Sequence, residues 1–275
     1  MANNRHNLSR YFTVTLQPEI APSIAHLNAF TANDLLFDWQ EFKLPSGGSR
    51  LIGITAVVRS TDGDDQTCAM DLFFARQALD MGDVTDGTAP VSMGTQHADP
   101  TINPANPYWD QVIGHAKLTA DNFSTAGAIE SGMTVGTTGY HSSTGATAGL
   151  TGQSPLIFSD YGTTPSDGNY TFYVGATCIG TPNFDSNLAY ASGTGTNDLT
   201  CDGTDARKIL APGDRIKAYD VSADDGTVID IGTVGTVPDA TSILLKGSTT
   251  NTGTLQDGDL IFNINPIKLI LTFER

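Results

Sequence analysis

The residues best suited to chemistry in this chain are aspartates, which occur in short runs beside glycine. The runs are Asp62-Gly63-Asp64-Asp65, Asp83–Asp86, Asp224-Asp225 and Asp257-Gly258-Asp259. Closely spaced carboxylates are ligands for Ca²⁺, but none of these runs has the spacing of an EF-hand loop. Aspartate and glycine are also the residues that tight turns require. We therefore interpret the runs as turns, keep a bound cation as the less favoured alternative, and expect no metal and no other cofactor.

Histidine is the second residue type that could carry chemistry. The five histidines are scattered, at His6, His26, His97, His115 and His141. No two of them have the i, i+4 spacing of a helical zinc motif, and the chain contains no GxSxG, HExxH, P-loop or helix-opening GxGxxG motif. We therefore name no catalytic, cofactor-binding or metal-binding residue and expect that the protein is not an enzyme.

Carbohydrate chemistry is the alternative that the sequence leaves open. A pair of aspartates on a β scaffold could act as a glycosidase, although nothing places an acid in an apolar pocket that would raise its pKa. The aromatic pair Tyr108-Trp109 could stack on a sugar, but aromatic residues after a proline-rich loop more often anchor that loop to the core. A hydrolase is therefore the last of the hypotheses in our order.

The composition limits the possible partners. The chain has 275 residues, a formal net charge of −16 and a pI near 4.3, which argues against binding to nucleic acid or to an anionic membrane. No apolar run approaches the length of a membrane span, and no secretory signal is visible at the N-terminus. Cys68, Cys178 and Cys201 are too few for a disulfide framework, so we expect reduced, buried thiols.

The stretch Leu35–Arg76 indicates an antiparallel β fold. It contains three apolar runs, Leu35–Leu44, Leu51–Val58 and Met70–Ala75, which are separated by turn-forming clusters rich in Gly, Ser and Asp. This pattern predicts three neighbouring antiparallel strands. The middle run is apolar on both faces, which is typical of a strand at the centre of a sheet or sandwich.

Further strands are predicted on either side of this stretch. They are Tyr11–Leu16, Val112–Leu118 (a strand or a short helix) and Asn169–Cys178, with 119–154 as a long loop. Four short candidates with tight turns then follow, at Arg207–Asp220, Thr227–Val237, Ser242–Leu245 and Asp259–Asn263, and predict a small barrel. The apolar run Ile264–Phe273 needs a partner outside that barrel, and we expect it to lie beside Tyr170–Cys178.

These elements predict an all-β protein: an antiparallel β-sandwich, jelly-roll-like, with a small β-barrel inserted before the last strand. We expect residues 1–10 to form a loose N-terminal arm. Residues 11–184 plus 263–275 form the predicted sandwich core, and residues 185–262 form the predicted inserted barrel.

Several phrases of this sequence resemble those of a family of virion structural proteins of tailed bacteriophages, of the marine and cyanophage type. The family patterns D-x-x-A-Y-x-x-G-D-V-L-F-D, E-I/L-P with a Gly-rich turn, L-x-S-I-T-V and D-K-D-D-Q-G-A-x-F/L-D-L-x-F-F are similar to Leu27–Asp38, Phe42–Gly48, Leu51–Ala56 and Asp62–Phe74. Tyr173–Pro182 and Pro266–Phe273 are similar to the closing strands of the family. The chain departs from the family by the inserted segment 185–262 and by Asn33, where the family usually has glycine.

The resemblance implies a non-enzymatic virion protein, made in the host cytoplasm and located in the virus particle. It implies a capsid decoration (cement) protein bound to the outer surface of the phage head. The implied partners are the major capsid protein and neighbouring copies of the chain, with no nucleic acid and no membrane; a homo-oligomer is left open. The alternative is a receptor- or glycan-binding module associated with the tail or a fibre, whose partner would be a host surface glycan.

Overall fold

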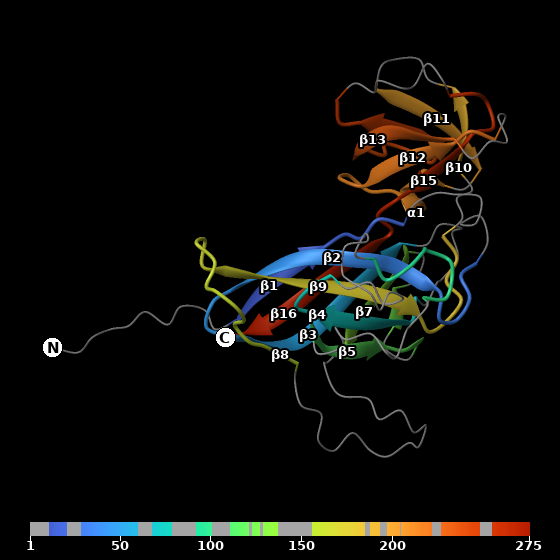
Figure 1. Cartoon of the computed structure of the whole chain (residues 1–275). Helices are drawn as coiled ribbons and strands as arrows, with labels where there is room; N and C mark the ends of the chain where they lie inside the picture. The colour runs from blue at the N-terminus through green and yellow to red at the C-terminus, as the bar shows by residue number, and fades with distance from the viewer. Residues whose placement is uncertain are drawn as a thin grey trace.

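The structure is a computed structural model that describes the following residues: 11–20, 29–59, 68–78, 92–100, 111–120, 123–126, 129–136, 156–184, 188–192, 197–203, 205–221, 227–247 and 255–275. In this part of the chain the elements are antiparallel strands with a single four-residue helical segment. Two sheets form a sandwich, and a closed barrel stands at one end of it (Figure 1). The predicted fold class, an all-β sandwich with a small barrel before the last strand, is confirmed.

The first sheet of the sandwich joins strands from the beginning, the middle and the end of the described chain. Its order is β1-β16-β3-β7-β6, and β8 also pairs with β3. The strands are β1 (Tyr11–Leu16), β16 (Ile267–Glu274), β3 (Ser49–Arg59), β7 (Ile129–Gly136), β6 (Phe123–Ala126) and β8 (Ile157–Phe158). The second sheet has the order β2-β9-β4-β5, with β2 (Leu35–Pro45), β9 (Asn169–Cys178), β4 (Met70–Ala75) and β5 (Val112–Leu118).

The predicted trio of neighbouring strands within Leu35–Arg76 is wrong in its pairing. β3 lies in the first sheet, whereas β2 and β4 lie in the second sheet on either side of β9. The turn between β2 and β3 carries the chain from one sheet to the other, and Gly47 and Gly48 there have φ values of 103° and 76°. Apolar runs alone do not reveal such a crossing, because a strand buried in either sheet has the same pattern.

The expected position of the last strand is also wrong. β16 pairs with β1 and β3, not with β9. β9 has no free side, because β2 and β4 occupy both of its edges. β9 and β16 instead complete the pairing of the Leu35–Arg76 strands, since β9 joins β2 to β4 and β16 pairs with β3.

Two further sequence predictions need correction. The segment 119–154, predicted as a loop, contains the strands β6 and β7. β7 pairs with β3 over six residues, which small residues can do because the ladder uses main-chain groups. The strand candidate Arg207–Asp220 is divided into the helical segment α1 (Ala206–Ile209) and the strand β12 (Arg215–Tyr219), since Pro212-Gly213 forms a turn between them.

A cluster of phenylalanines fills the space between the two sheets. Phe158, on the two-residue strand β8, lies at its centre and is 1% exposed. Its ring centroid lies 5.1–5.9 Å from those of Phe42, Phe74, Phe172 and Phe273, all in edge-on arrangements. Edge-to-face pairs add stabilisation beyond the buried area alone, so this short strand contributes more to the core than its length indicates.

The barrel is formed by strands that are contiguous in the chain. Its order is β10-β11-β14-β13-β12-β15, and the last strand closes on the first. The strands are β10 (Leu188–Ser192), β11 (Asp198–Gly203), β14 (Ser242–Leu245), β13 (Val228–Thr236), β12 (Arg215–Tyr219) and β15 (Leu260–Asn263). The interior is mainly aliphatic, with Ile209, Ile216, Ile243 and Ile261 fully buried.

Three turns with the same hydrogen-bonding pattern precede strands β2, β12 and β15. They are Thr31–Asp34, Ala211–Asp214 and Gln256–Asp259. In each turn the carboxylate of the last residue accepts a hydrogen bond from the N–H of the first, at 2.6, 2.8 and 2.8 Å. The third residue has a positive φ: 79° at Asn33, 96° at Gly213 and 94° at Gly258. Asparagine tolerates this conformation better than most residues, so Asn33 can occupy the place that glycine holds in the other two turns.

Candidate functional site

The aspartate runs do not form a metal site in the part of the chain that the structure describes. Asp62–Asp65, Asp83–Asp86 and Asp224-Asp225 lie outside the described residues. Asp259 is 1% exposed, and its carboxylate accepts hydrogen bonds from the N–H groups of Gln256 and Val221, at 2.8 and 3.2 Å. The described residues contain no group of three or more His, Cys, Asp or Glu side chains that could hold a metal ion. The interpretation of Asp257–Asp259 as a turn is therefore confirmed.

The two described histidines occupy separate structural positions, and His6, His26 and His141 lie outside the described residues. The ring of His97 lies against Phe30, with centroids 4.6 Å apart, and its Nδ1 is 3.8 Å from the Asp34 carboxylate. His115 belongs to β5 and pairs across the ladder with β4. The structure thus does not bring these two histidines to one site.

His115 belongs to a charged cluster on the outer face of the second sheet. Its Nδ1 is 2.9 Å from one oxygen of Asp71, and Lys117 Nζ is 3.2 Å from the other. The His115 ring also stacks on Phe73, at a centroid distance of 6.0 Å. An aspartate–histidine pair can orient a general base, but the described residues add no hydroxyl or thiol bonded to this ring. Because Asp71–Lys117 and Phe73–His115 are directly opposite residues of the ladder, the cluster stabilises strand pairing.

The three cysteines are not nucleophiles. All of them are free and buried, as expected from the sequence. Burial raises the pKa of Cys68 and Cys178 well above the ordinary thiol value and raises the pKa of Cys201 to about 12. The thiolate is the reactive form of cysteine, so these side chains remain protonated and unreactive at neutral pH.

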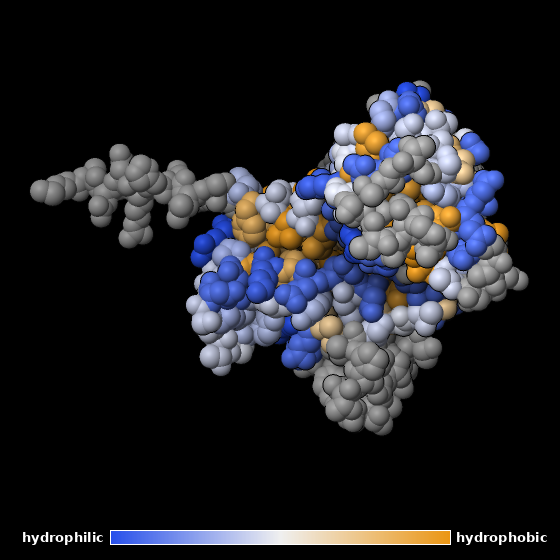
Figure 2. Space-filling view, turned by 90° about the horizontal axis from the view of Figure 1, so that it is seen from above, coloured by the Kyte–Doolittle hydropathy of each residue, from blue (hydrophilic) through white to orange (hydrophobic). Residues whose placement is uncertain are grey.

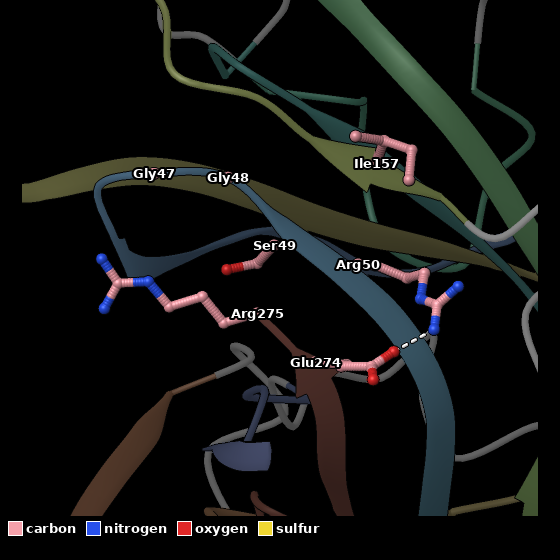
Figure 3. A pocket seen from close by; sticks show the side chains of 7 residues that line it. All are labelled: Gly47, Gly48, Ser49, Arg50, Ile157, Glu274 and Arg275. Carbon is pink, nitrogen blue, oxygen red and sulfur yellow. Dashed lines mark hydrogen bonds and ion pairs between the residues drawn. The ribbon is translucent and has the colours of Figure 1, made fainter. Parts of the chain in front are cut away.

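An open hollow of about 440 Å³ lies where the β2–β3 turn meets the end of β16 (Figure 3). Its lining residues are Gly47, Gly48, Ser49, Arg50, Ile157, Glu274 and Arg275. Most polar groups here are already engaged within the chain: Arg50 pairs with Glu274, and Arg275 donates to the Ser46 carbonyl at 2.6 Å. The Gly47 and Gly48 N–H groups donate to the Asp160 carboxylate, at 3.0 and 3.3 Å. The polar groups that line the hollow therefore hold the β2–β3 turn in place through contacts within the chain.

The joint between sandwich and barrel holds a concentration of charged and amide side chains. The Glu19 carboxylate forms ion pairs with Lys217 and, at 3.6 Å, with Arg215. In a second ion pair, Arg59 Nε lies 3.5 Å from Asp214 Oδ2. Glu19 and Arg59 follow or end strands of the first sheet, while the other three residues belong to the entrance and body of β12. The joint thus connects the two parts through side chains distant in sequence.

Asn263 and Asn265 complete the joint where the chain leaves the barrel. The Asn263 amide donates to Asp214 Oδ2 and to the Ile209 carbonyl, each at 3.0 Å. The Asn265 amide donates to the carbonyls of Gln17 and Pro18, at 3.0 and 3.2 Å. Burial raises the pKa of Asp214 above its usual 3.8, although the charge of Arg59 opposes that shift. These contacts orient the barrel relative to the sandwich.

The strand pattern of the sequence does not predict the joint. Two similar phrases, Pro212–Ile216 and Gln256–Ile261, are the available sequence signal, because each contains the buried aspartate of a turn that begins a strand. Glu19 and Arg59 had no comparable signal, since their partners depend on how the barrel is placed. The sugar-stacking candidate Tyr108-Trp109 lies outside the described residues.

Comparisons with known proteins assign no family. No protein-family model matches the chain. No curated protein matches it either. Among solved structures, the atomic structure of Sulfolobus Turreted Icosahedral Virus is 12% identical, covers 96% of this chain and 89% of that chain, and has a TM-score of 0.14. The crystal structure of the STIV MCP is 10% identical, covers 96% of each chain and has a TM-score of 0.11. TM-scores this low do not establish a shared fold.

One further property concerns membranes. Within the described residues, no helix combines the length and the apolar character that crossing a bilayer requires.

Proposed function

We propose that this protein is a non-enzymatic structural component of a virus particle, and specifically a decoration protein on the outer surface of a tailed-phage head. The sequence resemblance over residues 12–76 and the two closing strands is the first support. The described core and turns give that resemblance a physical meaning, because the matching phrases form β2, β3 and β4 and the turn before β2.

The observation that carries the proposal is the fixed position of the barrel at one end of the sandwich. The barrel stands off one end of the sandwich (Figure 1), and both chain connections to it occur at that end. Ion pairs from Glu19 and Arg59 and hydrogen bonds from Asn265 hold it there. A sandwich base with a fixed projecting knob fits a protein that binds a particle surface and extends outward from it.

The polar groups of the described chain support a structural role rather than catalysis. Buried Asp34, Asp214 and Asp259 satisfy backbone N–H groups in turns. Asp71 joins two strands through His115 and Lys117. These side chains are thereby used for folding, and a buried group already paired is poorly placed to move protons for a substrate.

The charge of the protein suits an external position on a particle. A net charge of −16 keeps acidic surfaces apart in solution. It also disfavours attachment to packaged nucleic acid, whose phosphates bind basic proteins. The proposed partners are accordingly the major capsid protein and neighbouring copies of this chain, and the proposed location is the virion.

The test is binding of the purified protein to empty phage heads, measured by co-sedimentation over a range of concentrations. We expect saturable binding that survives replacement of residues 185–263 by a short Gly/Ser linker, because the sandwich is the proposed base. The full-length variant Thr236→Lys, changed at an exposed position of the barrel, is the matched control and should bind like the wild type. Absence of saturable binding by the folded full-length protein would contradict the proposal.

A receptor-binding module of the tail or a fibre is the second candidate. The observation that favours it is exposed apolar surface on the projecting barrel, where Val221, Val228 and Leu244 are 47%, 38% and 39% exposed. Val221 follows β12 and Val228 begins β13, so both lie at the end of the hairpin where the chain passes from one strand to the other, a position suited to contact. This candidate predicts hits on a host-glycan array that are lost in Val221→Asp, and reduced host adsorption by particles whose barrel is deleted.

A further inference from the structure

Among the strands of the described chain, β1 forms an edge of the first sheet. It pairs with β16 and stands last in the strand order. The pairing runs from Tyr11 to Leu16 without a register shift. In an antiparallel ladder, alternate residues direct their N–H and C=O groups away from the neighbouring strand. β1 therefore presents a regular row of main-chain groups on the side opposite β16.

The other described sheet edges carry features that hinder the addition of a strand. β2 has two register shifts and carries Asp38, Glu41 and Lys43. β5 pairs through a bulge and carries His115 and Lys117, and the four-residue strand β6 also has a register shift. Bulges and charged side chains are the usual devices by which edge strands avoid pairing. β1 has neither of them, because its sequence is Tyr-Phe-Thr-Val-Thr-Leu.

Apolar side chains accompany this edge. Phe12, Val14 and Leu16 pack against the sandwich core from its margin and are only partly buried, whereas Thr13 and Thr15 on the opposite face are exposed. Seen from above in Figure 2, hydrophobic surface gathers on the sandwich in the region of β1 and β2. An added strand would thus gain main-chain hydrogen bonds and would also cover apolar surface.

We propose that β1 is a self-association strand, through which two copies of this chain join antiparallel into one continuous sheet. The absence of charged side chains on β1 favours a second copy of this chain as the added strand. β1 offers no ionic attraction to a basic or an acidic partner, so it favours a neutral, β-branched strand, and β1 is itself such a strand. Pairing β1 with β1 places no like charges opposite each other, although each chain carries a net charge of −16.

The two faces of β1 determine the register of this pairing. Opposite residues of an antiparallel pair lie on the same face, so the apolar residues must meet apolar residues. Placing Val14 opposite Val14 of the second copy sets Phe12 opposite Leu16 and Thr13 opposite Thr15. This register covers all three apolar side chains of each copy and continues both faces of the sheet across the two-fold axis.

The experiment uses the purified full-length protein and does not depend on the proposed virion role. Sedimentation equilibrium of the wild type should give a monomer–dimer equilibrium. The dimer should become stronger as salt rises, because salt screens the repulsion between the acidic chains. Thr13→Lys combined with Thr15→Lys places lysines opposite each other twice, and we expect the dissociation constant to rise on the order of 100-fold.

Two variants make the test specific. Thr13→Lys combined with Thr15→Glu places opposite charges across the proposed register, so this protein should dimerise at least as well as the wild type. Thr236→Lys adds a charge at an exposed position of the closed barrel and should leave the dimer unchanged. Circular dichroism verifies that each variant is folded. A wild type that stays monomeric at its highest soluble concentration, or a dimer that tolerates the double lysine variant, would overturn the proposal.

Discussion

The sandwich and the barrel reach a complete set of paired strands in different ways. All six strands of the barrel come from the contiguous stretch Leu188–Asn263, and the sheet closes on itself. The first sheet of the sandwich instead requires β1, β3 and β16, which lie at the beginning, middle and end of the described chain. A closed barrel has no edges, whereas an open sandwich keeps them. We therefore expect the barrel to fold as a self-contained unit, while the sheets of the sandwich keep edges to which a further strand can add.

The two cores also differ in the side chains that fill them. The sandwich core contains eight buried phenylalanines, whereas the barrel core contains none and is filled mainly by Ile, Leu and Val. Aromatic rings fill the wide space between two sheets with few side chains, while branched aliphatic residues suit the narrow interior of a small barrel. The two cores share no residue, so a core substitution in one part should leave the other part largely unaffected.

The largest expected effect is the loss of stability caused by a core substitution, which should affect only the part of the molecule that contains it. Phe158→Ala removes a ring that contacts four others and should destabilise the sandwich by about 3–5 kcal/mol. Calorimetry should show a lowered sandwich transition and an unchanged barrel transition. Ile243→Ala, the counterpart in the barrel, should do the reverse. A single transition that shifts equally in both variants would show that the two parts unfold as one unit.

The next effect concerns the type of aspartate turn that occurs in both the sandwich and the barrel. Asp259→Ala in the barrel and Asp34→Ala in the sandwich each leave a backbone N–H without its carboxylate partner. Each change should reduce the free energy of unfolding by about 1–3 kcal/mol. Chemical denaturation of each variant measures this loss, and Asp239→Ala, at an exposed turn, is the control with a smaller expected effect. Equal stability of Asp34→Ala and the wild type would refute the role assigned to this turn.

The positive φ values of these turns give a smaller effect. Asn33→Ala should destabilise the sandwich by about 1 kcal/mol, because alanine is strained at a φ of 79°. Asn33→Gly relieves the strain and should be neutral or slightly stabilising. In the barrel, Gly258→Ala should resemble Asn33→Ala, since Gly258 has a φ of 94°. Thermal unfolding of the three variants compares them, and equal effects of alanine and glycine at position 33 would disagree with the described conformation.

The smallest effect concerns the joint and depends on pH. Burial raises the pKa of Asp214 above 3.8. Because this pKa is higher in the folded state than in the unfolded state, the protonated carboxyl contributes stability at pH values below the unfolded-state pKa. That contribution is lost as pH rises through the folded-state pKa. The wild type should therefore lose a little barrel stability as pH increases just above 3.8, whereas Asp214→Asn should lose less. Unfolding of both proteins across this pH range measures the difference, and identical pH profiles would exclude Asp214 as the cause.

The elements that the sequence predicted correctly are those whose pattern is local. Asn169–Cys178 alternates, and its predicted strand is confirmed; the turn chemistry of Asp257–Asp259 is local and also confirmed. Strand pairing is not local, so β16 was expected beside β9 although β2 and β4 already occupy both sides of β9. β7 was missed because glycine, serine and threonine carry little periodic signal when the main chain makes the contacts.

The joint could not be predicted for a related reason. Glu19 lies near Lys217 and Arg215 because the barrel returns to the first sheet, which the strand pattern does not specify. The buried aspartates were visible as turn residues, but their burial depends on packing. Sequence reasoning therefore identified the two parts of the molecule and their order, and not the contacts that hold them together.

Counting this chain in purified virus particles tests the central proposal most directly. Quantitative mass spectrometry gives the molar ratio of this protein to the major capsid protein. A decoration protein should be present at a fixed ratio that matches the sites of the capsid lattice, and it should remain after the tails are removed. Absence from purified particles, or loss together with the tails, would contradict a role on the surface of the head.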